Sequence, residues 1–178
     1  MWRYLTPVVI LAVLVAFFAV GLQRDPSFVP SPLIGQPMPE FDLPQLQRPD
    51  SRLATAELAK GEPILVNVWA TWCVGCREEH DKLLEIADSG VIPIYGLNWK
   101  DDNRAALHWL DRLGDPYVTT AVDADGRVAI DWGVYGAPET FLIDGDGVVQ
   151  FKHIGPITDR VWERDFLPRI EALQGGRS

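Results

Sequence analysis

The chain has 178 residues, with 16 Lys and Arg against 25 Asp and Glu, which gives a formal net charge of −9. An acidic surface repels nucleic acid and anionic lipid headgroups, so the composition disfavours proteins that bind either one. Apart from an apolar N-terminal segment, the chain is long enough for one domain with a hydrophobic core.

The N-terminal segment predicts a membrane anchor. Leu5 to Leu22 carries no charged residue and is long enough for a membrane-spanning helix. A cleaved signal peptide is the alternative, because the small residues around 19–21 suit a cleavage site. The uninterrupted apolar length favours an uncleaved signal anchor over residues 1–24. Residues 25–34 contain three prolines and predict an extended tether to the domain at 35–178.

Strands and helices are expected to alternate in this domain, which predicts an α/β fold with a mixed central sheet flanked by helices. Residues 35–44 mix prolines with apolar residues and predict an edge strand or an N-terminal hairpin. The other expected elements, in chain order, are a short helix over 51–60 with Thr55 as its N-cap, a buried strand over 64–69, a helix over 74–88, a strand over 92–98, a helix over 101–113, a strand over 118–122, a short helix over 127–132, a hairpin of 140–144 and 148–153, and a helix over 158–173.

The two longer early helices are expected to be amphipathic. The inner face of the helix over 74–88 should carry Leu83, Leu84, Ile86 and Ala87, with Glu79 outside it or near the site. The stripe of the helix over 101–113 should carry Ala106, Leu107, Leu110 and Leu113.

The residues that indicate chemistry are Trp72-Cys73-Val74-Gly75-Cys76, at the junction of a buried strand and a helix. The first turn of a helix has unpaired N–H groups and a positive dipole end, which stabilise a thiolate. We therefore expect Cys73 to be an exposed nucleophile and Cys76 to be a more buried resolving thiol, as in thiol–disulfide exchange. The cysteine pair would be the redox centre, and no bound cofactor would be needed.

A zinc site and a purely structural disulfide are the two other interpretations of the cysteine pair. A zinc site usually takes four ligands, and the chain has only two Cys and three His, of which His80 lies one turn after Cys76. A purely structural disulfide that closes so short a loop would restrict the unfolded chain little. Redox chemistry is favoured over both, and no metal site is predicted.

The pattern of strand, WCxxC, helix and a later Ala137-Pro138 ahead of a strand resembles the thioredoxin superfamily. Within it, the chain resembles the membrane-anchored CcmG/DsbE thiol:disulfide interchange proteins of cytochrome c biogenesis. The stretches that carry this resemblance are residues 35–44, 67–73, 76–80, 93–102, 131–140 and 153–156.

The resemblance implies further roles at the site. The Ala137–Pro138 bond would be cis and face the cysteines, which leaves a backbone edge free for a substrate strand. Glu79 and Glu139 would be acidic residues that disfavour the thiolate of Cys73 and so make a stronger reductant. Asn67 lies where thioredoxins carry a buried acid, so either glutamate would supply proton transfer instead. Trp72 would cover the site.

The dipeptide between the cysteines departs from the family pattern. Relatives commonly have Cys-Val-Pro-Cys, whereas this chain has Gly75. Glycine adds backbone freedom to the dithiol state, so we expect a weaker disulfide and a somewhat less reducing protein. Replacing Gly75 with Pro should then lower the reduction potential.

The resemblance also implies a function and partners. The substrate would be apocytochrome c or its haem-ligation partner, and a membrane thiol transporter of the DsbD/CcdA type would supply electrons. We expect a single-pass protein of the bacterial inner membrane with its domain in the periplasm, since a single cysteine pair fits an oxidising compartment. The alternatives are an exported reductase for metal-site assembly or disulfide repair, a module that only binds apocytochrome or haem, and an oxidase.

Overall fold

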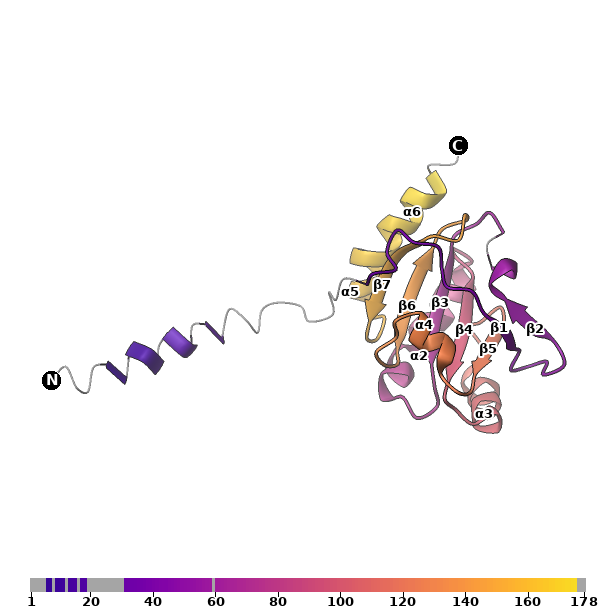
Figure 1. Cartoon of the computed structure of the whole chain (residues 1–178), viewed down its shortest axis with the longest axis horizontal. Helices are drawn as coiled ribbons and strands as arrows, with labels where there is room; N and C mark the ends of the chain where they lie inside the picture. Colours follow the sequence, from indigo (N-terminus) through magenta and orange to yellow (C-terminus); the bar gives the residue numbers. More distant parts are fainter. Residues whose placement is uncertain are drawn as a thin grey trace.

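The computed structural model describes residues 31–58 and 60–175, together with residues 6, 7, 9–11, 13–15, 17 and 18 (Figure 1). Most of the expected anchor over 1–24 and of the tether over 25–34 lies outside the described residues. Among the residues that are described, no helix has the length and apolar character needed to cross a membrane.

The domain is built on a five-stranded mixed sheet, as the sequence predicted. Its strands, in spatial order, are β5 (Thr120–Asp123), β4 (Ile94–Trp99), β3 (Ile64–Trp69), β6 (Glu139–Ile143) and β7 (Val149–Ile154). The pairs β3–β4 and β4–β5 are parallel, whereas β3–β6 and β6–β7 are antiparallel. The central strand β3 therefore has a parallel neighbour on one side and an antiparallel neighbour on the other.

Helices and turns cover both faces of this sheet. They are η1 (Thr55–Glu57), α2 (Val74–Ser89), α3 (Asn103–Leu113), α4 (Arg127–Asp131) and a C-terminal helix made of α5 (Asp159–Val161), the π-helical η2 (Trp162–Phe166) and α6 (Leu167–Gly175). Side chains from α2, α3 and the C-terminal helix form one hydrophobic cluster with the sheet. The other face packs against α4 and the chain around β1 and β2. Figure 1 shows α4 in front of the sheet and the β1–β2 pair beside its β5 edge.

Side chains along β3 alternate between these two faces. Leu65 and Trp69 pack in the cluster with α2, whereas Val66 and Val68 pack in the cluster with α4. Every residue of β3 is buried, so the sequence of this strand is apolar throughout apart from Asn67. Because side chains alternate along a strand, Asn67 faces α2, and this places an amide behind the cysteines.

A short antiparallel pair, β1 (Asp42–Pro44) with β2 (Arg52–Ala54), precedes the central sheet. The predicted helix over 51–60 is therefore wrong, since β2 and a single 3₁₀ turn occupy this stretch. Thr55 is not an N-cap either. Its hydroxyl accepts a hydrogen bond from the N–H of Phe41 at 2.6 Å, which ties the turn back to the strand pair.

Both predicted helix stripes need correction. In α2, Leu83 and Ile86 are buried as expected, but Glu79 is fully buried with them. In α3, Leu107 and Leu113 are each 40% exposed, and Trp109 takes the buried place beside Ala106 and Leu110. The indole of Trp109 packs in the cluster with the sheet, although the predicted stripe of alanine and leucines did not include it.

Candidate active site

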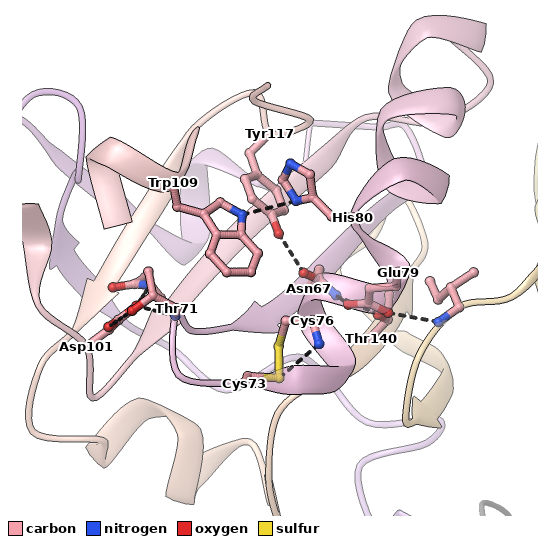
Figure 2. Close-up of a disulfide and its surroundings, with 12 residues drawn as sticks. Asn67, Thr71, Cys73, Cys76, Glu79, His80, Asp101, Trp109, Tyr117 and Thr140 are labelled. Atoms are coloured by element: carbon pink, nitrogen blue, oxygen red, sulfur yellow. Dashed lines mark hydrogen bonds between the residues drawn. A yellow bond between two sulfur atoms is a disulfide. The ribbon is translucent and has the colours of Figure 1, made fainter. Parts of the chain in front are cut away.

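Cys73 and Cys76 form a disulfide at the start of α2 (Figure 2). Cys73 is the N-cap of this helix, and its Sγ accepts a hydrogen bond from the N–H of Cys76 at 3.0 Å. Both cysteines are buried, with exposed fractions of 5% and 3%. The expectation that Cys73 is exposed is therefore wrong for this disulfide state, because its sulfur turns inward to the helix N-terminus while Trp72 and Val74 face solvent.

Trp72 is anchored on one side of the disulfide turn. Its indole N–H donates to the carbonyl of Lys100 at 3.1 Å, and its ring contacts Trp99 with centroids 5.6 Å apart. About half of the side chain remains exposed. A large aromatic surface thus stands next to Cys73, where a substrate chain would approach.

The proline loop lies directly against the cysteine turn. The Ala137–Pro138 bond is cis, as the resemblance implied. A Cβ added at Gly75 would lie 2.9 Å from Cδ of Pro138 and 3.2 Å from Cγ of Pro156. The absence of a side chain at Gly75 therefore allows two prolines to pack closely on the turn between the cysteines.

A hydrogen-bonded network lies behind the disulfide (Figure 2). Asn67 donates from Nδ2 to Oε1 of Glu79 at 2.9 Å and to the hydroxyl of Thr140 at 3.0 Å. Its Oδ1 accepts from the hydroxyl of Tyr117 at 2.8 Å, and Oε2 of Glu79 accepts from the N–H of Ile157 at 2.8 Å. At position 67, where the resemblance implied that thioredoxins carry a buried acid, this chain thus has an amide that hydrogen-bonds the carboxyl group of Glu79 from α2.

Burial raises the pKa of Glu79 from an ordinary 4.5 to about 7, and the hydrogen bonds from Ile157 and Asn67 oppose this rise. Cys76 and Glu79 are three residues apart in a helix, so their side chains lie on the same face. A carboxyl group that titrates near neutral pH therefore lies one turn behind the second cysteine. A solvent-exposed Glu79 is excluded.

The second predicted acid, Glu139, is also buried but has a different partner. Its Oε2 lies 2.8 Å from Nζ of Lys152, and both side chains are almost completely inaccessible. Lys152 also donates to the carbonyl of Gly133 at 2.7 Å, while Oε1 of Glu139 accepts from the N–H groups of Tyr135 and Gly136. This ion pair fastens the loop that leads into Pro138.

Sequence reasoning missed Lys152 and Tyr117. A lysine that follows Phe151 in a hairpin strand reads as an outward-facing residue, and nothing local indicates its partner. The alternation of β7 was the available signal, since Phe151 packs with the C-terminal helix and Lys152 must therefore face the opposite side. Tyr117 comes just before a strand and gave no comparable signal.

His80 is used structurally. Its Nδ1 accepts a hydrogen bond from the indole N–H of Trp109 at 3.3 Å, and its Nε2 lies 3.1 Å from the carbonyl of Gly114, so Nε2 carries the proton. Burial lowers the pKa of His80, which favours this neutral form. Figure 2 shows the ring beside Trp109, away from the sulfur atoms. Within the described part of the chain, no group of three His, Cys, Asp or Glu is arranged to hold a metal ion.

Comparison with known proteins agrees with this geometry. The family model described as Redoxin matches residues 33–166. The thiol:disulfide interchange protein DsbE of Pseudomonas aeruginosa is 49% identical, over 95% of this chain and 93% of its own length. DsbE of Escherichia coli K12 is 43% identical, over 94% and 92% of the two chains.

A solved structure supports the fold. The crystal structure of a DsbF homologue from Corynebacterium diphtheriae superposes with a TM-score of 0.68, at 20% identity, over 85% of this chain and 95% of that one. Identities of 49% and 43% to DsbE proteins over nearly the full length of the chains, together with the disulfide at the start of α2, show the family. The chain belongs to the DsbE (CcmG) thiol:disulfide interchange proteins of the Redoxin family and is a thiol–disulfide oxidoreductase.

Proposed function

We propose that this oxidoreductase works as a reductant in cytochrome c maturation, and that its substrate is the disulfide of apocytochrome c or of its haem-ligation partner. The observation that carries the direction of transfer is the buried carboxyl of Glu79, which lies one turn behind Cys76 without a cationic partner among its hydrogen bonds. A carboxylate there disfavours negative charge on the nearby sulfur atoms. A less stabilised dithiol state gives up its electrons more readily.

The exchange proceeds in two steps. In the reduced protein, the thiolate of Cys73 attacks one substrate sulfur, which breaks the substrate disulfide and forms a mixed disulfide. Cys76 then loses its proton to Glu79 and attacks Sγ of Cys73, which closes the Cys73–Cys76 disulfide and releases the second substrate thiolate. Two electrons pass from the cysteine pair to the substrate. A membrane thiol transporter of the DsbD/CcdA type restores the dithiol.

Pro138 and Ala137 receive the substrate in this scheme. Their loop packs on Gly75, so a substrate strand that pairs with the backbone there brings its disulfide to Cys73. Trp72 supplies apolar surface on the other side. We further propose that residues 1–24 anchor the protein in the bacterial inner membrane and that the tether holds the domain at the periplasmic surface.

The reduction potential of the full chain, equilibrated against a thiol buffer, tests the direction. A value below about −200 mV supports a reductant, whereas a value near about −120 mV indicates an oxidase and contradicts the proposal. A Cys73→Ala, Cys76→Ala double variant tests the redox role in cells. Cytochrome c assembly should fail in this variant and recover when an external thiol is added. Normal assembly without added thiol would indicate a module that only binds its partner.

A further inference from the structure

A pocket of about 340 Å³ opens between α2 and α3, next to the disulfide turn. Its lining includes Thr71, two residues before Cys73, and Arg77, directly after Cys76. The opposite wall comes from α3, through His108 and Arg112. The residues that flank Trp72–Cys76 on both sides thus border the pocket, which places it next to the redox centre.

The pocket is cationic in a chain whose net charge is −9. Two guanidinium groups and one imidazole contribute to its lining, and none of the described lining residues is an acid. Among the described residues, Arg77, His108 and Arg112 form no ion pair. Asp101, a carboxylate that contacts the lining, accepts two hydrogen bonds from Thr71 at 2.6 Å each. Its oxygens are therefore already engaged.

Arg77 is held in place by Trp109, which is part of the pocket lining. Trp109 is only 6% exposed, and the guanidinium carbon of Arg77 lies 4.4 Å from the centre of its ring. The indole is itself fixed by its hydrogen bond to His80. A guanidinium that is already ordered loses less side-chain entropy when it binds an anion.

We propose that this pocket is a subsite for a carboxylate of the substrate polypeptide, namely an acidic side chain a few residues from the substrate cysteine. Guanidinium groups bind carboxylates through paired N–H donors, and the imidazole of His108 adds another donor. The proposal rests on the proposed function, because it requires the occupant to be part of a disulfide-bearing polypeptide. To that function it adds a preference for substrates with an acidic residue near the disulfide.

The test uses the reduced full chain and pairs of synthetic peptides with one internal disulfide each. Within a pair, the peptides differ only in Glu or Gln at one position, and the position is moved through the three residues on either side of a cysteine. We expect the Glu peptide to be reduced about two- to five-fold faster at its best position, as for a solvent-accessible ion pair. The preference should decrease as salt is added.

Arg112→Gln should remove most of this preference. Arg104→Gln is the matched control, because Arg104 lies on the same helix, is exposed and is outside the pocket lining. It makes the same change in net charge and should leave the Glu preference in place. Equal rates for Glu and Gln peptides at every position, or an equal loss of preference in both variants, would overturn the subsite.

A binding measurement separates this proposal from the proposed function. The same peptides, with serines in place of cysteines, are titrated into the oxidised chain by calorimetry. A Glu preference that Arg112→Gln removes supports the subsite even if the protein reduces none of the disulfide peptides, in which case the reductase proposal alone fails. Equal affinities together with normal reduction of both peptides would overturn the subsite and leave the reductase proposal intact.

Discussion

Two buried glutamates on opposite faces of the sheet show how the partner of a carboxyl group decides what it can do. In β6, Glu139 and Thr140 are neighbours in sequence and point to opposite sides. Thr140 joins the network of Glu79 behind the disulfide, while Glu139 meets Lys152 on the side of Phe141 and α4.

The two carboxyl groups are equally buried, but only one has a cation to balance it. Glu139 is half of an ion pair that also holds the loop before Pro138, so its role is to fix structure. Glu79 has an amide and a backbone N–H as partners, and its pKa rises to about 7. A buried carboxylate that is paired with a cation fixes the structure, whereas a buried carboxyl group with neutral hydrogen-bond donors can exchange a proton.

The largest expected effect comes from breaking the ion pair between Glu139 and Lys152. Lys152→Met leaves the carboxylate of Glu139 buried without its cation, and this should lower the free energy of unfolding by about 3–5 kcal/mol. Urea unfolding of the oxidised protein, followed by tryptophan fluorescence, measures the loss.

A surface ion pair supplies the control for this variant. Lys82 bridges Glu85 and Asp159, whose side chains are 68% and 79% exposed. Lys82→Met should therefore lower the free energy of unfolding by less than about 1 kcal/mol. Adding Glu139→Gln to Lys152→Met should recover part of the lost stability, because the unpaired charge is removed. A Lys152→Met loss no larger than that of Lys82→Met would contradict the structural role of the Glu139–Lys152 ion pair.

The next effect concerns Glu79. Between pH 4.5 and about 7 the folded protein keeps a proton on Glu79 that the unfolded chain has released, so stability falls as pH rises through this window. The full difference is on the order of 3 kcal/mol, at about 1.4 kcal/mol for each pKa unit. Glu79→Gln should abolish this slope, which unfolding measurements at a series of pH values would show.

His80 titrates with the opposite sign, since its pKa is lowered and acid therefore destabilises the folded state below about 6.5. The informative quantity is thus the difference in stability between wild type and Glu79→Gln at each pH. That difference should change between pH 4.5 and 7 and stay constant above it. The rate at which Cys76 resolves a mixed disulfide should also show a midpoint near 7 in wild type and lose it in Glu79→Gln. Parallel pH profiles for the two proteins would rule out the proton-transfer role.

Much of the fold and the reacting pair could be predicted from the sequence, because both depend on local signals. The apolar run of β3, the helix that begins at Cys73 and the alternation of strands and helices are each visible within short windows. The proline loop and the family followed from motifs with fixed spacing. These features need no knowledge of what packs on what.

The environment of each acid could not be predicted, since it depends on contacts between distant segments. Glu79 sits among charged residues in a helix that reads as half exposed, and only the docking of Ile157 and Asn67 encloses it. Glu139 follows the proline motif, but its cation lies on the next strand. The exposure expected for Cys73 failed for a local reason, because the disulfide turns its sulfur toward the helix N-terminus.

The smallest expected effect comes from Gly75, where the turn of α2 meets the proline loop. Gly75 is in the turn of α2 that leads to Glu79, and it packs on Pro138, whose loop Glu139 holds. Gly75→Ala places a methyl group 2.9 Å from a proline ring that has little freedom to move, so overpacking should cost about 1–3 kcal/mol. Gly136→Ala is the control, because a Cβ there meets nothing within 4 Å.

If the ion pair between Glu139 and Lys152 holds the proline loop firmly, the added methyl group must displace the turn of α2 rather than the loop. Gly75→Ala should then slow the reduction of substrate disulfides by at least about five-fold, the factor that corresponds to 1 kcal/mol of strain in the transition state, while Gly136→Ala stays near the wild-type rate. Combining Gly75→Ala with the paired change Lys152→Met, Glu139→Gln frees the loop and should restore part of the rate. If removing the ion pair leaves the rate of Gly75→Ala unchanged, the two regions are not coupled through this contact.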